Sequence, residues 1–459
     1  MKLLALEIST SSHKAQYYDT LTGYSRVLSD RNRANAGIDE LCVQVIELGR
    51  KVVDNNSVDR ITTAGTWHSL VVCDAQHKPV MPLTDWTDIP SRSLCEVLRK
   101  DDTFIDSYYH QSGAMVNAIY PFFTLLKLHK EGALSTEHRV SSLASYLHYR
   151  LTGAWKETSS MLSGMGLLST EKEEIHQMAK ALPCTIAPIV APDCVSLLSA
   201  EAARILGQNA GIAVLPPFPD GALNQIGSQA QDGQIMTLSM GTSAAMRLSI
   251  PTPWFSPTRS TWLYRSPSSY LLGAATSGCT NCVDWYKTLA FAPDVSYAMI
   301  EQPLKHETEL PIFLPFIAGE RCPGWIDTRQ SSFHDLSAST SASVMYQAVL
   351  AGVVANLYQC FEQILKSSQE IKTIRLSGGV LQSSFWKHMC CNYFGFPMEE
   401  DTQAQASLFG ALVLGARSAG EDLFKTHAVK RNTLQPDAGL HARYQEHYKR
   451  YLHWYTKTK

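Results

Sequence analysis

The chain has 459 residues, of which 45% are hydrophobic and 18% are charged, and its formal net charge is -2. This length and composition predict a globular protein of roughly two to four domains with large buried cores. The balanced charge and the lack of a Lys/Arg block argue against nucleic acid or an anionic membrane as the main partner, because both require a concentrated basic surface. A small-molecule substrate is the better expectation.

Two apolar stretches bear on location. Residues 1–6 supply too few apolar residues before Glu7 for a signal peptide, which predicts a cytoplasmic protein. The longest apolar stretch, residues 344–360, is interrupted by Gln and Asn and falls short of the ~20 residues of a membrane helix, so it predicts a buried helix. The eleven cysteines lack the paired spacing of a zinc site.

The first elements in chain order are two strands joined by a turn of hydroxyl residues. Residues 2–8 predict a strand, residues 9–12 a turn, residues 15–19 a second strand and residues 38–53 a helix. The same order of elements begins again at residue 234, where a strand meets Gly241-Thr242-Ser243 and a second strand follows over 244–250. The repeat predicts an α/β protein with two similar domains, 1–243 and 244–459, whose loops meet in a cleft.

The first turn offers groups that suit phosphoryl transfer. That reaction needs donors around the phosphates and a metal held by a carboxylate, because its transition state is stabilised mainly by charge placement. Glu7 is a candidate catalytic carboxylate that holds Mg²⁺ through water, and hydroxyl, amide or ammonium donors for phosphate come from Ser9, Thr10, Ser11 and Lys14. Ser/Thr turns are common, so the turn alone is a weak signal.

Two later turns offer further phosphate donors and a candidate general base. Gly241, Thr242 and Ser243 form a turn suited to the other side of the phosphates. Asp220 follows a rigid proline run and precedes a glycine, as a general base requires, although an Asp in this place is also a good N-cap for a helix over 222–226.

The nucleoside and the sugar have candidate sites of their own. Gly378 and Gly379, followed by Gln382 and Ser383, let the backbone approach a flat ligand such as adenine, or form a plain strand-to-helix turn. Aromatic faces and hydrogen-bonding groups for a sugar alternate in Trp67, His68, Trp86 and Asp88. A lone Trp or His there is more often part of a core.

The order of these motifs resembles the FGGY carbohydrate kinases, which include glycerol, xylulose, ribulose and gluconate kinases, over nearly the whole chain. Besides the segments around Glu7, Asp220, Gly241 and Gly378, the similar segments are Gly319-Glu320-Arg321-Cys322-Pro323 and Ala406-Ser407-Leu408-Phe409-Gly410-Ala411. Gluconate kinases look most similar through Trp67-His68-Ser69-Leu70 and Gly241-Thr242-Ser243-Ala244-Ala245-Met246-Arg247, with xylulose kinases next.

The resemblance implies two ribonuclease-H-like domains of the actin/hexokinase superfamily facing each other across a cleft. It implies Mg-ATP as donor, a small sugar, sugar acid or polyol as acceptor, and Asp220 as the base and a substrate-binding group. Members of the family are often dimers, but no stretch of this sequence identifies an interface, so a homodimer stays open.

Several positions depart from the family pattern. Glu7 stands where the family usually has Asp, Ser9 where it has Gly, and Pro90 where it has Arg, with Arg92 two positions late. Because Mg²⁺ demands octahedral geometry at ~2.1 Å, a carboxylate moved outward by about one methylene predicts either slower catalysis or an adjusted loop. Three further polar or aromatic positions are changed, at Lys127, Thr158 and Ala351.

Two other functions stay open at this level. The departures at Glu7 and Ser9 fit a catalytically weakened or silent homologue that acts as a sugar or nucleotide sensor, which Glu7→Asp would distinguish by restoring turnover. An actin-like or chaperone-type ATPase would share the phosphate turns but would hydrolyse ATP without sugar.

Overall fold

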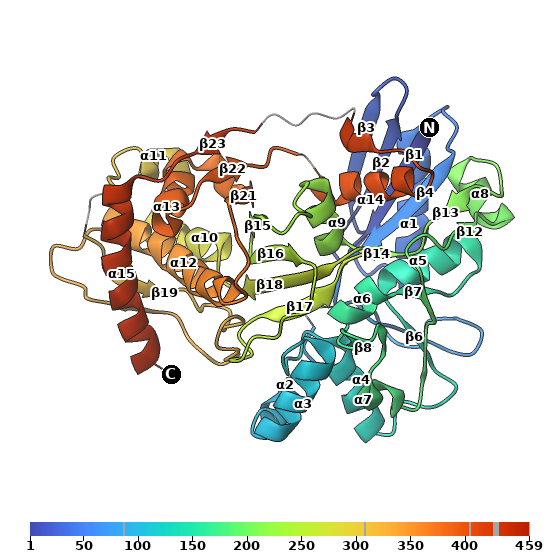
Figure 1. The fold of residues 1–459 in the computed structure, drawn as a ribbon, viewed down its shortest axis with the longest axis horizontal. Helices are drawn as coiled ribbons and strands as arrows, with labels where there is room; N and C mark the ends of the chain where they lie inside the picture. The colour runs from blue at the N-terminus through green and yellow to red at the C-terminus, as the bar shows by residue number, and fades with distance from the viewer. Residues whose placement is uncertain (86–87, 307–308, 404, 426–430, 459) are drawn as a thin grey trace. The chain divides into compact units, whose positions relative to one another are not determined.

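The computed structural model describes the chain except for residues 86–87, 307–308, 404, 426–430 and 459. It divides into two compact units, each assembled from three segments (Figure 1). Unit 1 comprises Met1–Gln229, Leu263–Leu271 and Gln403–Val429, and unit 2 comprises Ala230–Trp262, Leu272–Thr402 and Lys430–Lys459. This division begins at 229/230, not at the expected 243/244, and it assigns two later segments to unit 1.

Unit 1 is built on a seven-stranded sheet. Its path is β12-β13-β4-β1-β2-β3, and β14 also pairs with β4. β1 (Lys2–Ile8), β2 (Ser12–Asp19) and β3 (Ser25–Arg31) pair antiparallel in sequence, whereas β4 (Arg60–Gly65) pairs parallel to β1. The predicted strand, turn and strand at the start of the chain are confirmed.

Alternate residues of β1 enter two different cores. Leu4, Leu6 and Ile8 pack in the cluster that contains the buried face of α1 (Ile38–Val53). Leu3 and Ala5 pack in the other cluster, with α14 (Ala406–Arg417). Because side chains alternate along a strand, Glu7 lies on the α14 side of the sheet.

On that side, α9 (Asp220–Gly227) and α14 cross at unusually close range. A Cβ added to Gly227 would lie 1.9 Å from the Ala406 carbonyl oxygen, and one added to Gly410 would lie 2.0 Å from that of Leu223. Both positions therefore require glycine, which accounts for Gly410 in the segment 406–411.

Unit 1 also contains further short strands and helices. The remaining strands are β5 (Val71–Cys73), β6 (Arg139–Ser141), β7 (Glu157–Thr158), β8 (Leu168–Ser169), β9 (Glu174–Ile175), β10 (Thr185–Ile186), β11 (Ile189–Val190), β12 (Ser196–Leu197), β13 (Ala213–Val214) and β14 (Phe218–Pro219). The helices are α2 (Arg92–Leu98), α3 (Asp102–Ser112), α4 (Pro121–Lys130), α5 (Leu143–Thr152), α6 (Ser159–Gly164), α7 (Gln177–Lys180), α8 (Ala200–Leu206) and the short η2 (Leu423–Lys425).

The central strands of unit 2 repeat the strand pairing seen in unit 1. Its sheet has the order β17-β18-β16-β15-β21-β22-β23, so β15 (Ile235–Met240) lies between its antiparallel partner β16 (Ala244–Ile250) and its parallel partner β21 (Thr373–Gly378). β1 lies in the same way between β2 and β4. The predicted repeat of the strand order is confirmed.

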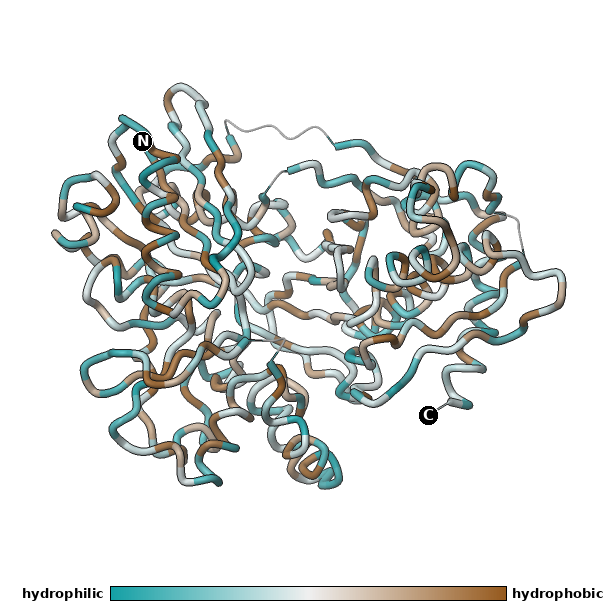
Figure 2. Tube along the Cα trace, turned by 180° about the vertical axis from the view of Figure 1, so that it is seen from behind, coloured by the Kyte–Doolittle hydropathy of each residue, from teal (hydrophilic) through white to brown (hydrophobic). Residues whose placement is uncertain are grey.

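The other strands of this sheet and unit are β18 (Tyr270–Thr276), β19 (Ile312–Leu314), β20 (Ser332–His334), β22 (Met398–Glu400) and β23 (Thr433–Leu434). The edge strand β17 (Trp262–Arg265) has all but its first residue in the segment Leu263–Leu271 that is assigned to unit 1. The helices are α10 (Thr280–Ala290), α11 (Tyr297–Glu301), α12 (Ala342–Leu365), η1 (Gly379–Gln382), α13 (Ser384–Phe394) and α15 (Ala438–Lys457). In Figure 2 hydrophilic colour follows many outer loops, and hydrophobic segments run through the packed elements of each unit.

Helix α12 is a core helix of unit 2. By length and composition it could cross a membrane, but 83% of its most apolar stretch is buried inside the protein. It contacts β19, α10 and α13. The expectation of a buried helix over 344–360 is confirmed.

Candidate active site

Glu7 is buried and held on both carboxylate oxygens. It lies opposite Lys14 in the β1–β2 ladder, and Lys14 Nζ donates to Glu7 Oε1 at 2.8 Å. The hydroxyl of Ser407, at the start of α14, donates to Glu7 Oε2. With one methylene more than Asp, the Glu7 side chain contacts both Lys14 of the neighbouring strand β2 and Ser407 of helix α14.

The turn that follows is closed by the side chain of Ser9. Ser9 Oγ donates to the Ser12 carbonyl oxygen at 2.6 Å and accepts from the Ser12 amide at 3.3 Å. Asn32 Nδ2 donates to the Ser9 carbonyl oxygen at 2.8 Å. A glycine at position 9 would lack the first two contacts, so Ser9 makes the turn more rigid. Thr10 is half-buried and Ser11 is exposed at its tip.

Asp220 is the first residue of α9, and the N-cap is Pro219. Its Oδ1 accepts from the Gly221 amide at 2.8 Å and from the Trp67 amide at 3.5 Å. The carboxylate thus has a fixed orientation near the end of β4, whose Ala64 and Gly65 pair with β14. Asp220 therefore lies one position inside the helix instead of at the expected N-cap position, and its side chain still accepts from an amide of the first turn.

Trp67 and His68 lie beside Asp220, and both are fixed by backbone carbonyls of α6. Trp67 Nε1 donates to the Ser160 carbonyl oxygen at 2.9 Å, and its indole is buried. His68 has a positive φ of 58°, and its Nδ1 is hydrogen-bonded to the Gly164 carbonyl oxygen. Gly164 is packed so closely that an added Cβ would lie 2.1 Å from Trp67 Cδ1.

Two tyrosines complete this aromatic group and were not predicted. The rings of Tyr120 and Tyr264 lie edge-on to His68, at centroid distances of 5.3 and 6.0 Å, and their hydroxyls are 2.7 Å apart. Tyr264 comes from the segment Leu263–Leu271 that joins unit 1 late in the chain. No local pattern around Tyr264 distinguishes it from an ordinary strand residue.

The second predicted sugar-binding segment is only partly described. Trp86 lies outside the described residues. Asp88 is exposed and lines a different pocket of about 450 Å³ together with Pro90 and Lys127. Arg92 forms an ion pair with Glu96 on its own helix, with Nε and Oε1 3.5 Å apart. The substrate-binding role of Asp88 stays a prediction.

In unit 2, Gly241, Thr242 and Ser243 form the turn between β15 and β16. The Gly241 amide donates to the Ser243 carbonyl oxygen at 3.0 Å, and the amide of Thr280 at the start of α10 donates to the Gly241 carbonyl oxygen at 2.9 Å. Thr242 is exposed at the tip. The turn is thereby fixed to the helix that borders the pocket described next.

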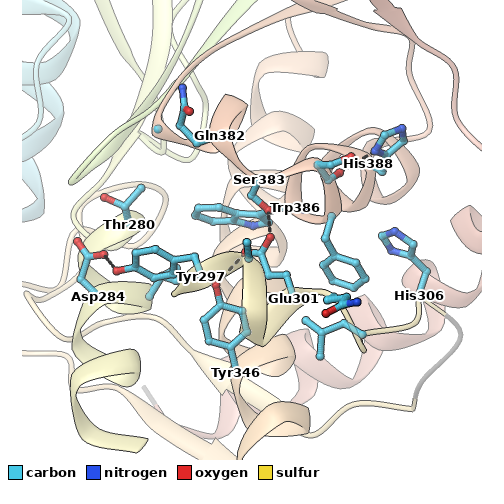
Figure 3. A pocket seen from close by; sticks show the side chains of 17 residues that line it. Thr280, Asp284, Tyr297, Glu301, His306, Tyr346, Gln382, Ser383, Trp386 and His388 are labelled. Carbon is cyan, nitrogen blue, oxygen red and sulfur yellow. Dashed lines mark hydrogen bonds between the residues drawn. The ribbon is translucent and has the colours of Figure 1, made fainter. Parts of the chain in front are cut away.

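A pocket of about 790 Å³ lies in unit 2 (Figure 3). The predicted nucleoside residues Gly379, Gln382 and Ser383 line it, together with Thr280. Gly378 precedes them with a φ of +93°, and an added Cβ would lie 2.4 Å from the Met240 carbonyl oxygen. The Gly-Gly turn therefore requires glycine at 378 for its backbone conformation and for its approach to β15.

The rest of the pocket comes from segments distant in sequence. Its aromatic lining includes Tyr297, Tyr346, Phe385 and Trp386. Glu301 Oε2 accepts from the Ser383 hydroxyl at 2.7 Å and Oε1 accepts from the Tyr346 hydroxyl at 2.9 Å. The Tyr297 hydroxyl donates a hydrogen bond to the Asp284 carboxylate. Burial and this carboxylate raise the pKa of Tyr297 to about 12.

The segment Gly319–Pro323 has a structural role. Glu320 and Arg329 form a buried ion pair, with Oε2 and Nη1 3.0 Å apart, and the Tyr455 hydroxyl of α15 donates to Glu320 Oε1. The Gly324 amide donates to the same oxygen at 3.0 Å. These contacts fix α15 to the loop before β20.

The donor set suits a metal that arrives with a nucleotide. Among the described residues there is no group of three or more His, Cys, Asp or Glu side chains that could enclose an ion. Mg²⁺ in phosphoryl-transfer sites is typically held by one or two carboxylates together with substrate phosphates and water. A single fixed carboxylate such as Glu7 fits that mode.

Comparison with known proteins gives the family. The FGGY family of carbohydrate kinases matches with its N-terminal domain over residues 25–227 and with its C-terminal domain over residues 236–419. The gluconokinase of Bacillus licheniformis is 22% identical over 452 residues, which cover 91% of this chain and 88% of that protein. The xylulose kinase of Escherichia coli is 23% identical over 409 residues, covering 84% and 82%.

Solved structures share the fold over the full length. A gluconate kinase from Lactobacillus acidophilus has a TM-score of 0.91 at 22% identity and covers 100% of this chain and 98% of its own. A ligand-bound xylulose kinase from the same organism has the same TM-score and identity and covers 99% and 98%. With both family domains present and this fold, the chain belongs to the FGGY family of carbohydrate kinases.

Proposed function

We propose that the protein transfers the γ-phosphate of ATP to a hydroxyl of a small sugar or sugar acid, with gluconate as the first candidate and a pentulose such as xylulose as the second. The observation that supports this most is the placement of Asp220. Its carboxylate is fixed by two backbone amides beside Trp67 and His68, in a chain of a carbohydrate kinase family. The gluconokinases and xylulose kinases among the relatives suggest the two acceptors.

Asp220 acts in this proposal as the general base. Its Oδ1 accepts from amides, and the carboxylate takes the proton of the attacking hydroxyl as that oxygen bonds to the γ-phosphorus and the bond from the γ-phosphorus to ADP breaks. The positive end of the α9 dipole favours the charged form of the carboxylate. Trp67, His68, Tyr120 and Tyr264 form the aromatic wall of the sugar site.

The nucleotide occupies the pocket of unit 2, with its phosphates toward Gly241, Thr242 and Ser243. Glu7 would hold Mg²⁺ through water, and the bound ion would supply positive charge to the phosphates. Lys14 and the hydroxyls of Ser9, Thr10 and Ser11 are the candidate phosphate ligands of unit 1. A cytoplasmic location is part of the proposal, since ATP is supplied there.

The test is an ADP-release assay with Mg-ATP against D-gluconate, D-xylulose, D-ribulose, L-ribulose, glycerol, L-fuculose and D-fructose. We expect turnover on one acceptor, D-gluconate first. Asp220→Asn keeps an oxygen that accepts from both amides but removes the base, so it should lower kcat by ~10²- to 10⁴-fold and leave ADP binding unchanged. Wild-type turnover by that variant would refute the assignment of the base.

A further inference from the structure

The pocket of unit 2 contains a carboxylate whose orientation is fixed from two sides. Glu301 is the last residue of α11, and its two oxygens accept from Ser383 at the start of α13 and from Tyr346 in α12 (Figure 3). The two hydroxyls come from different helices and bind different oxygens. The carboxylate plane is therefore set before any ligand arrives.

The described hydrogen-bond partners of this carboxylate are neutral hydroxyl groups. No Lys or Arg occurs among the residues described as lining the pocket, and the two histidines there are engaged elsewhere. His306 stacks on Phe385 at 4.2 Å and is hydrogen-bonded to Tyr444, and His388 Nδ1 lies 2.7 Å from the Ser384 carbonyl oxygen. Each carboxylate oxygen has lone-pair capacity beyond the one bond it accepts here.

A ligand group that meets Glu301 must therefore donate hydrogen bonds. A phosphate would be repelled, whereas hydroxyl and amino groups would gain charge-assisted bonds. The Thr280 and Gly379 part of the lining is joined to the Gly241 turn by the bond from the Thr280 amide. Glu301 comes from a different helix, α11, than Thr280, which begins α10.

We propose that Glu301 accepts hydrogen bonds from the ribose 2′- and 3′-hydroxyls of the phosphate donor and so selects ribonucleotides over 2′-deoxyribonucleotides. Two adjacent hydroxyls match the two oxygens of one carboxylate, and an acidic side chain on the ribose 2′-hydroxyl is a general solution in nucleotide sites. The inference rests on the proposed function, because that function assigns this pocket to the nucleotide.

Calorimetric titration with ADP and with 2′-deoxyADP tests the inference without requiring turnover. Loss of one hydrogen bond to a charged group corresponds to roughly a 10- to 100-fold loss of affinity, so the wild type should bind ADP at least ~10-fold more tightly than 2′-deoxyADP. Glu301→Gln should weaken ADP binding and bring the ratio close to one. Tyr346→Phe removes one orienting hydroxyl and should reduce the ratio partly.

Asp284→Asn is the matched control, since Asp284 is another carboxylate of the same pocket and accepts from the Tyr297 hydroxyl instead. It should keep the wild-type ratio. Thermal melting of each variant establishes that it is folded.

Two results would overturn the inference. One is equal binding of the two nucleotides by the wild type. The other is a Glu301→Gln variant that loses affinity equally for ADP and 2′-deoxyADP. That result would mean that the carboxylate contacts the nucleobase instead of the ribose.

Failure of the proposed function can be distinguished from failure of this inference. If ADP is preferred as expected but no acceptor is phosphorylated, the ribose contact stands without the kinase reaction. If the protein turns over a sugar but does not distinguish the two nucleotides, the kinase stands and the role of Glu301 is refuted.

Discussion

Lys14 and Glu7, direct partners across the β1–β2 ladder, form an ion pair with Nζ and Oε1 2.8 Å apart. The pair joins the proposed metal carboxylate to a proposed phosphate ligand. Since Glu7 is buried and Lys14 is only partly exposed, the pair fixes the start of the phosphate turn more firmly than an exposed ion pair would. The departure from Asp to Glu is therefore integrated into the packing.

Glu7→Gln should lower kcat by at least ~10²-fold, because it removes the charge that balances Lys14 and that holds the metal in the proposed function. Glu7→Asp keeps the charge, shortens the reach toward Ser407 and should retain more activity than Glu7→Gln. The measurement is ADP release over a range of Mg²⁺ concentrations.

The control for this pair is Glu131→Gln, which breaks the exposed pair of Glu131 with Lys127, 2.8 Å apart on α4. It should leave kcat unchanged. Equal activities of Glu7→Gln and the wild type would show that Glu7 is not needed for metal or phosphate.

Gly164→Ala should raise KM for the sugar and leave ADP affinity unchanged. The new methyl would lie 2.1 Å from Trp67 Cδ1, so the indole must move from the place where Ser160 fixes it, at an overpacking cost of about 1–3 kcal/mol. Steady-state kinetics and a thermal melt measure the two effects.

Gly37→Ala is its control, because the added Cβ would meet nothing within 4 Å. A Gly164→Ala enzyme with unchanged sugar KM would contradict the placement of Trp67 at the sugar site.

Gly378→Ala should lower Tm and weaken ADP binding. Its φ of +93° strains any residue with a Cβ, and the methyl would meet the Met240 carbonyl oxygen at 2.4 Å, at an expected cost above ~1–3 kcal/mol. Gly379→Ala, whose Cβ would make an ordinary 3.5 Å contact with Thr280, is the comparison for Tm. If the two variants melted at the same temperature, the backbone argument for Gly378 would be wrong.

Glu157 gives unit 1 a pH-dependent stability. It is fully buried, its Oε2 accepts from the Ser142 amide at 3.0 Å, and burial raises its pKa to about 7. Because the folded pKa lies above the ordinary value, the folded state prefers the protonated acid. Its contribution is fully present below pH ~4.5 and is lost as the pH rises through about 7.

Glu157→Gln mimics the protonated acid, so it should stabilise the protein above pH 7 by an amount on the order of 3 kcal/mol and have little effect near pH 4.5. Urea unfolding at several pH values measures the difference from the wild type. A difference that does not grow with pH would contradict this origin.

The sequence predicts the local parts of the fold well. The strand, turn and strand units around Glu7 and Gly241 form where alternation and hydroxyl turns place them, because strand pairing between neighbours needs little beyond local pattern. The long apolar stretch likewise becomes a buried helix, α12, as its local composition predicts. Gly378 also lies where the turn requires glycine, whereas a Cβ at Gly241 would meet only the Ser243 carbonyl oxygen, at 3.8 Å.

The contacts that join distant segments could not be predicted in this way. Glu301 reaches Ser383, and Tyr264 reaches Tyr120, only through tertiary packing that no short pattern encodes. The contact of Glu7 with Ser407 is intermediate, since alternation along β1 places Glu7 on one face but does not say which helix covers that face. The placement of residues 403–429 in unit 1 is likewise a result of packing.

That placement has a consequence for folding during synthesis. Leu3, Ala5 and the apolar face of α9 are covered by α14, but roughly 10 to 35 s of translation separate Gln229 from Ala406 at ~5–20 residues per second. The first sheet therefore exposes one apolar face to the cell until the end of the chain emerges. Truncation before residue 406 would leave this face open, and the protein would depend on chaperones to avoid aggregation.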